Sequence, residues 1–153
     1  MTTLYRLIKQ RHSGKAFDGS GGLIVGGRWH RKGIPVVYAA QSLSLAALEF
    51  FVHFGKSEQR IALVYFELKI EDALIDVLDS SVLPADWRAE PPAASTAAVG
   101  TAWLRSGKNV ALRVPSVISP GESNYVINPA HPAISRMSIS KPFPYSFDPR
   151  LWK

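Results

Sequence analysis

The chain has 153 residues, of which 46% are hydrophobic and 20% charged, and it contains no cysteine. This length and composition predict a single domain spanning residues 1–153, with a hydrophobic core. The lack of cysteine excludes disulfides and thiolate metal sites, and no stretch approaches the roughly 20 apolar residues that cross a bilayer. Because no secretory signal is visible either, we expect a cytoplasmic protein without membrane contact.

The net charge of +6 is unevenly distributed. Residues 1–35 carry seven Lys/Arg and one acid, residues 36–90 carry four and nine, and residues 91–153 carry seven and two. The two basic ends could form one positive cleft for a polyanion or a phosphorylated small molecule. Ordinary solvated surface charge is the other interpretation, and composition does not decide between them.

The first half of the chain predicts two strands and a helix around a glycine-rich loop. Residues 2–8 alternate in polarity and predict a strand, whereas residues 13–27 contain six glycines and predict a flexible loop. Residues 35–40 predict a buried strand. A helix should then begin after the N-cap Ser42 and run to about residue 54, before Gly55.

The second half predicts more strands than helices. A helix is expected over residues 93–105, while residues 83–92 and the proline-containing tail should be irregular. Strands are expected over residues 60–70, 74–78, 110–114, 124–127 and 134–140. Since no regular βαβ alternation is present, the fold class is α+β, with a central, mostly antiparallel or mixed sheet flanked by helices.

Glu49 is the single formally charged residue between Lys32 and Lys56, and it stands in the apolar run Leu-Ala-Ala-Leu-Glu-Phe-Phe-Val. Apolar residues all round a helix predict that the helix is buried. A carboxylate there is costly unless it is paired or faces a cleft. His53, four residues later on the same helix face, is one candidate partner.

Other catalytic signatures are missing from the sequence. It contains no phosphate-binding P-loop, no G-x-S-x-G nucleophile elbow and no H-E-x-x-H pair, so we expect no metal site. Two further polar residues flank the apolar stretch. Arg28 follows two glycines and suits bidentate phosphate binding. Tyr38 lies in a strand-like run, where its ring could belong to the core or stack on a ligand.

The order of several short motifs is similar to that of the RES domain family. The similarity begins with Leu-Tyr-Arg at residues 4–6 and continues through Gly-Gly-Arg-Trp-His at 26–30, Val-Tyr-Ala at 37–39 and the run around Glu49. Val-Pro-Ser at 114–116, Glu-Ser-Asn-Tyr at 122–125, Asn128-Pro129 and His131-Pro132 extend it to the C-terminal half. The resemblance therefore covers nearly the whole chain.

This resemblance implies a toxin of a type II toxin–antitoxin pair with a fold like that of ADP-ribosyltransferases. Such a toxin would use NAD⁺ as its substrate, need no metal, and cleave the N-glycosidic bond by hydrolysis or phosphorolysis. Transfer of ADP-ribose to a host protein is the alternative. Its partner would be an Xre-like antitoxin, through which alone it would meet DNA.

The resemblance also assigns roles by motif. Arg28, Tyr38 and Glu49 would form an Arg-Tyr-Glu catalytic triad, with Arg28 and Tyr38 also binding NAD⁺. Ser116 would be a further catalytic residue, fixing either the nicotinamide amide or Glu49. The remaining candidates for lining the NAD⁺ pocket are Arg6 and Asn124. With this site, Glu49 should face a pocket whose walls are the apolar residues around it.

Two non-enzymatic readings stay open from the sequence. A basic domain could bind nucleic acid, although its aromatic residues are not interleaved with Lys/Arg and no nucleic-acid-binding motif is found. A RES-like domain that has lost activity could serve only as an interaction partner, although Arg28, Tyr38 and Glu49 are all retained.

Overall fold

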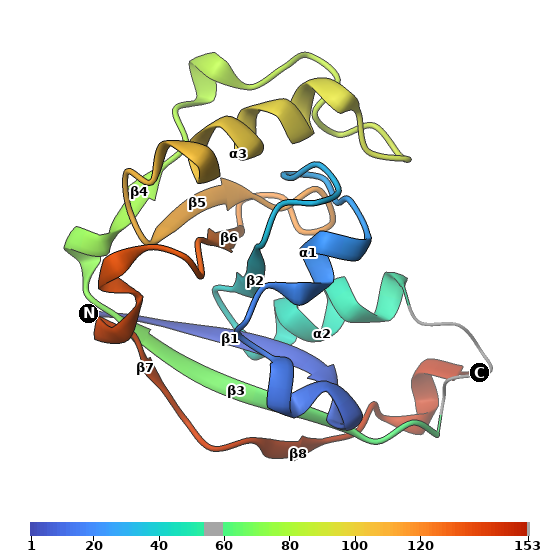
Figure 1. Ribbon diagram of the computed structural model, residues 1–153. Coiled ribbons are helices and arrows are strands. Elements are labelled where there is room, and N and C mark those ends of the chain that lie inside the picture. Colours follow the sequence, from blue (N-terminus) through green and yellow to red (C-terminus); the bar gives the residue numbers. More distant parts are fainter. Residues whose placement is uncertain (54–59, 153) are drawn as a thin grey trace.

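The computed structural model describes residues 1–53 and 60–152 (Figure 1). Among these residues, eight strands form one sheet in the order β4-β5-β6-β2-β1-β3-β7, with β8 also paired to β3. The strands are β1 (Thr2–Lys9), β2 (Val37–Ala40), β3 (Leu63–Ile70), β4 (Ile75–Val77), β5 (Ala111–Pro115), β6 (Ser123–Ile127), β7 (Ser138–Ile139) and β8 (Phe143–Tyr145). The β4–β5 pair is parallel and the other pairs are antiparallel. The predicted α+β class with a mixed sheet is confirmed.

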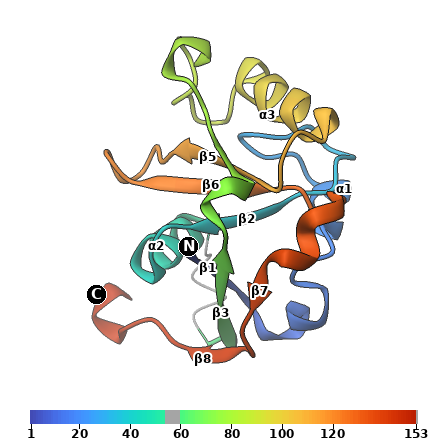
Figure 2. The ribbon, with the colours of Figure 1, turned by 90° about the vertical axis from the view of Figure 1, so that its left-hand side faces the viewer.

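The sheet is bent between β1 and β2. Strand β1 pairs with β3 along its whole length, from Thr2 opposite Ile70 to Lys9 opposite Leu63. Its register with β2 is limited to Tyr5 opposite Ala40. In Figure 2, β2, β5 and β6 accordingly run crosswise to β1 and β3. The sheet therefore consists of two halves joined by a short contact.

The helices cover the two halves at different places. Helix α2 (Leu43–Val52) packs on β1 and β2, and α3 (Ala94–Ser106) lies over β5 (Figure 1). The remaining helical segments are α1 (Ser20–Ile24) and the 3₁₀ turns η1 (Gln10–Lys15), η3 (Asp72–Leu74), η4 (Ser80–Val82), η5 (Pro132–Arg136) and η6 (Pro149–Trp152). None of the helices within residues 1–53 and 60–152 is both long and apolar enough to cross a membrane.

Three buried clusters hold these layers together. One joins Leu4 and Phe66 of the long strand pair to Ala16 and Met137. A second packs α2 against β1 through small and branched side chains, Leu7, Ala40, Leu45, Ala46, Ala47 and Leu63. The third places Trp29 between α3 and the β5–β6 pair. The segment that carries Arg28 is thus anchored by its neighbour Trp29, which is 3% exposed.

The prediction for α2 was partly right. Ser42 is the N-cap, and its hydroxyl accepts a hydrogen bond from the Leu45 N–H at 3.1 Å. The predicted end around residue 54 lies outside the described residues, as does Gly55. Burial all round the helix was wrong, because Leu48 and Val52 are 40% and 53% exposed. One side of α2 packs on the sheet, Phe50 and Phe51 contact Phe147 of the C-terminal tail, and Leu48 and Val52 face solvent.

Three other predictions differ from the structure. The expected loop over residues 13–27 contains part of η1 and all of α1, where Gly22 packs so closely that an added Cβ would overlap the Ile34 carbonyl. In place of the expected strand over residues 134–140, η5 takes residues 134–136 and β7 is limited to residues 138–139. The tail was expected to be irregular but adds β8 to β3. A proline is tolerated in β8 because it is an edge strand.

Gly100 on α3 offers a test of this packing. A Cβ added there would overlap the carbonyl of Trp29, so Gly100→Ala should lower the free energy of unfolding by about 1–3 kcal/mol. The loss should appear although alanine favours helices by about 1 kcal/mol over glycine. Urea unfolding measures it, with Gly14→Ala as the control because nothing lies within 4 Å of a Cβ at Gly14. Equal stability of Gly100→Ala and the wild type would contradict the close α3–Trp29 contact.

Candidate functional site

A cleft of about 780 Å³ lies where the two halves of the sheet diverge. Helix α2, strands β1, β2 and β6 and two loop segments, residues 26–29 and 90–92, contribute to its lining. Five of the six residues singled out from the sequence line it, and they are Arg6, Arg28, Tyr38, Glu49 and Asn124. The sixth, Ser116, contacts one of these five from behind the lining.

Glu49 projects from α2, and one of its carboxylate oxygens is fixed by two neutral donors. Its Oε1 accepts a hydrogen bond from Asn124 Nδ2 at 2.7 Å and another from Ser116 Oγ at 3.0 Å. Within the part of the chain that the structure describes, Oε2 has no hydrogen-bond partner. The carboxylate is therefore held in one orientation with one oxygen left for a ligand.

Ser116 is a support for Glu49. It is 4% exposed, and its hydroxyl accepts the Ser119 N–H at 3.1 Å while donating to Glu49. Of the two roles considered from the sequence, fixing the nicotinamide amide or fixing Glu49, this geometry favours the second. Asn124, which sits opposite both Ala40 and Val114 in the sheet, adds the second donor from β6.

The Glu49–His53 pair considered from the sequence is not formed. Both side chains line the cleft, but His53 is exposed and the carboxylate is bonded to Ser116 and Asn124. The i, i+4 spacing put the two residues on one helix face correctly. The strands facing α2 then supplied better-placed partners for the carboxylate.

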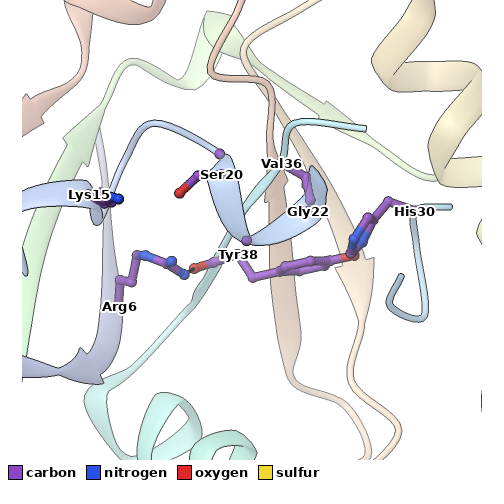
Figure 3. A pocket seen from close by; sticks show the side chains of 9 residues that line it. Arg6, Lys15, Ser20, Gly22, His30, Val36 and Tyr38 are labelled. Carbon is purple, nitrogen blue, oxygen red and sulfur yellow. Dashed lines mark hydrogen bonds between the residues drawn. The ribbon is translucent and has the colours of Figure 1, made fainter. Parts of the chain in front are cut away.

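Tyr38 leaves β2 with its ring in the cleft lining and its hydroxyl against His30. Its Oη lies 2.6 Å from Nδ1 of His30, which is 5% exposed. Figure 3 shows the Tyr38 side chain pointing toward His30. Burial raises the pKa of Tyr38 above its ordinary value, so the phenol is protonated at neutral pH. Tyr38 also borders a second, smaller cavity of about 130 Å³ beneath α1.

Arg28 is already engaged by the chain. Its Nη1 donates to the carbonyl oxygens of Trp87 and Ala89, both at 2.8 Å, and Nη2 forms a 3.1 Å ion pair with Glu90. The arginine side chain is 17% exposed and that of Glu90 is 73% exposed. Arg28 thus ties the loop over residues 87–90 to the cleft through two backbone carbonyls and through the Glu90 carboxylate, which solvent can reach.

Arg6 supports the backbone of the site from β1. Its Nε donates to the Ala16 carbonyl at 2.8 Å, and Nη1 donates to the Tyr38 carbonyl at 2.9 Å (Figure 3). Burial lowers the pKa of Arg6 to about 10, with Asp18 acting in the opposite sense, so the group is a cation at neutral pH. One of its donors therefore holds the strand that carries Tyr38, and another holds the Ala16 carbonyl just after η1.

The charges in the cleft are nearly balanced. Among the described lining residues, Arg6 and Arg28 face Glu49 and Glu90. The strongly positive cleft that the basic ends of the sequence could have formed is therefore not observed. No cluster of three or more His, Asp or Glu in residues 1–53 and 60–152 is arranged to hold a metal ion.

Two residues of the site were not identified from the sequence. Glu90 lies in a proline-rich loop 62 positions from Arg28, and no sequence signal links the two. His30 was quoted only as the last residue of the Gly-Gly-Arg-Trp-His motif. That motif was the available signal, because it places a titratable ring two residues after Arg28.

Comparison with known proteins connects this site to a family. The RES domain matches residues 3–148. Toxin Res of Yersinia enterocolitica (serotype O:8 / biotype 1B) is 38% identical over 149 residues, which cover 97% of this chain and 98% of that protein. The Prs ADP-ribosylating toxin of Sphingobium sp. (strain YBL2) is 35% identical over 155 residues, covering 98% and 96%.

A solved structure shows the same fold. A chain of the M. tuberculosis MbcT–MbcA toxin–antitoxin complex matches with a TM-score of 0.76, covering 99% of this chain and 86% of that one. At a sequence identity of 18%, this match shows only that the two chains share a fold. The domain match and the two relatives above 30% identity confirm the resemblance drawn from the motifs: the chain belongs to the RES domain family.

Proposed function

We propose that this protein is the toxin of a toxin–antitoxin pair and that it acts in the cytoplasm by cleaving the N-glycosidic bond of NAD⁺. The observation that carries this proposal is Glu49 on the wall of a large cleft, whose carboxylate is fixed through Oε1 and has no partner at Oε2 among the described residues. A volume of about 780 Å³ is in the range of small-molecule sites. The names of relatives such as Toxin Res support the toxin assignment.

Cleavage of the N-glycosidic bond of NAD⁺ is favoured by a fixed negative charge beside the ribose. As the bond between ribose C1″ and the nicotinamide nitrogen breaks, nicotinamide leaves neutral with the bonding electron pair, and positive charge develops on the ribose. A preoriented carboxylate stabilises that charge because it needs no reorganisation. Glu49 would do this through Oε2, which would also hold a ribose hydroxyl, while Ser116 and Asn124 keep the carboxylate in place.

The other residues would bind the dinucleotide. Arg28 would hold the pyrophosphate or a ribose oxygen, because a guanidinium suits bidentate contact with phosphate oxygens. Tyr38 would lie against the nicotinamide end of the ligand. Arg6 would act by keeping the Tyr38 backbone in place, and Asn124 by its contact with Glu49.

The acceptor that attacks C1″ could be water, phosphate or a protein side chain. Transfer to a protein is the second candidate, favoured by the Prs ADP-ribosylating toxin at 35% identity. Incubation of the purified protein with NAD⁺, with and without phosphate and with cell lysate, followed by mass analysis, separates the three. The respective products are free ADP-ribose, ADP-ribose 1″-phosphate and a protein carrying ADP-ribose. If all of the added NAD⁺ remained intact, the proposal would be rejected.

We further propose an antitoxin of Xre type as the protein partner. The solved complex with a TM-score of 0.76 joins a toxin to an antitoxin, which supports a partner of this class. Co-expression with the neighbouring reading frame and co-purification tests it. Such a complex should lose NAD⁺ cleavage while the free toxin keeps it, and an unchanged rate in the complex would contradict this assignment.

The role of Glu49 is tested by Glu49→Gln. Glutamine keeps an oxygen that can accept from Ser116 and Asn124 but carries no negative charge, so the fold should persist. We expect NAD⁺ cleavage to fall at least about 100-fold, since the electrostatic stabilisation of the ribose is lost. Glu71→Gln is the matched control, because Glu71 forms an ion pair with Arg136 and does not line the cleft. Wild-type cleavage by Glu49→Gln would reject the assignment.

The ion pair between Arg28 and Glu90 predicts competition with the ligand. A pyrophosphate that binds Arg28 must share it with the Glu90 carboxylate, so Glu90→Gln should lower KM for NAD⁺ by about two- to fivefold, as suits an exposed pair.

Arg28→Ala should lower kcat/KM for NAD⁺ at least about tenfold, or ~1.4 kcal/mol, because the guanidinium that would bind the pyrophosphate is removed. Steady-state kinetics measure both, with Glu71→Gln as the control. An unchanged KM in Glu90→Gln would mean that the Glu90 carboxylate and the pyrophosphate of NAD⁺ do not compete for Arg28.

A further inference from the structure

The imidazole of His30 is buried between two fixed oxygen atoms. Its Nε2 lies 2.8 Å from the carbonyl oxygen of Val25, and its Nδ1 lies 2.6 Å from the hydroxyl of Tyr38. Figure 3 shows the ring of Tyr38 reaching from β2 to His30. With 5% of its surface exposed, His30 has little access to solvent. Both nitrogens are therefore satisfied by the chain.

These two contacts determine where the protons lie. A carbonyl oxygen accepts hydrogen bonds and cannot donate, so Nε2 carries the proton that goes to Val25. In a neutral ring Nδ1 is then a lone pair, and the Tyr38 hydroxyl must donate to it. Burial lowers the pKa of His30, which favours this neutral ring at pH 7. The phenol proton of Tyr38 is consequently committed to His30.

Gly27 is packed against the same pair. A Cβ added at Gly27 would lie 2.8 Å from His30 Cε1, 3.0 Å from His30 Nδ1 and 3.2 Å from the Tyr38 hydroxyl. The Gly27 N–H also donates to the His30 carbonyl at 3.0 Å, which closes the turn that carries Arg28 and Trp29. The Gly-Gly-Arg-Trp-His turn thus holds the His30–Tyr38 contact from one side. It also places the phenol oxygen beside Gly27, and both Gly27 and Tyr38 are lining residues of the cleft.

We propose that His30 is a positioning residue that makes Tyr38 a pure hydrogen-bond acceptor toward the bound ligand. Because the phenol proton points to His30 and the Trp29 backbone also bonds the phenol oxygen, Tyr38 can offer the cleft only an oxygen lone pair, together with the face of its ring. A ligand group at this place must therefore donate, as the carboxamide N–H or a ribose hydroxyl of NAD⁺ can do. Phosphate oxygens, which only accept, are directed away from Tyr38 and toward Arg28.

This inference rests on the proposed NAD⁺ cleavage. It assigns opposite hydrogen-bonding roles to Arg28 and Tyr38 in the cleft. Arg28 donates and therefore selects acceptors, whereas Tyr38 accepts and therefore selects donors. A Tyr38 that was free to rotate its proton would bind either class of group. His30 removes that choice without touching the ligand itself.

A double-mutant cycle tests the coupling. We expect His30→Ala and Tyr38→Phe each to lower kcat/KM for NAD⁺ by about tenfold, and the double variant to lose no more than either single variant. This result follows if His30 acts through the Tyr38 hydroxyl. Additive losses in the double variant would overturn the proposal, since His30 would then act independently of Tyr38.

Two conservative variants distinguish positioning from simple packing. The amide oxygen of His30→Asn can take the place of Nδ1 and accept the phenol proton, whereas the longer side chain of His30→Gln matches Nε2 instead. His30→Asn should therefore retain several-fold more activity than His30→Gln, with both variants checked for folding by circular dichroism. Equal activity of the two would overturn the proposal.

A spectroscopic measurement needs no activity. In ¹H–¹⁵N spectra of the histidine side chains of the wild type, His30 should show a proton on Nε2 and none on Nδ1, and Tyr38→Phe should shift the Nδ1 signal. A proton on Nδ1 would overturn the proposal. If the wild type showed the expected spectra but cleaved no NAD⁺, the proposed NAD⁺ cleavage would be rejected and the proton arrangement of His30 and Tyr38 would be retained.

Discussion

The site depends on the short contact between β1 and β2. Their ladder is limited to Tyr5 and Ala40, and beyond this pair the strands separate. Arg6 occupies the separation, and its guanidinium donates to the carbonyls of Tyr38 and Ala16 in place of a neighbouring strand. A buried cation is costly unless hydrogen bonds satisfy it. Arg6 therefore helps to hold the sheet in its opened form through the Tyr38 carbonyl.

Opening the sheet creates the cleft and decides what faces it. Helix α2 packs against β1 and β2 on one side of the opening, and the turn over residues 26–30 lies on the other. A charge on α2 that a fully buried helix would not tolerate is then placed beside Asn124 of β6 and near Ser116 at the end of β5. Both donors are neutral, so they orient the carboxylate of Glu49 without cancelling its charge. That is the property which stabilisation of a developing cation on the ribose requires.

Most of the candidate residues could be predicted from the sequence. Apart from the Ser116–Glu49 contact, which was one of the two roles considered for Ser116, their contacts could not. Arg28, Tyr38 and Glu49 stood out by their surroundings in the chain and by the order of the motifs. The partners came from elsewhere in the sequence: Glu90 for Arg28, Asn124 and Ser116 for Glu49, and His30 for Tyr38. The local candidate His53 was wrong, because helix spacing shows which residues share a face but not which strand lies opposite that face.

The sequence by itself determined the elements with strong local signals and the family. Periodicity and the Ser42 cap were sufficient for β1, α2 and α3, and the ordered motifs were sufficient for the RES domain. The tertiary structure alone decided the bend of the sheet, the edge strand β8 and the loop over residues 87–90 that reaches Arg28. Each of these depends on pairing between segments distant in the chain, which local propensity does not encode. The same reason explains Glu49. The cost of its charge could be inferred from its neighbours in sequence, whereas the orientation of its carboxylate depends on Ser116 and Asn124, which reach it only in the fold.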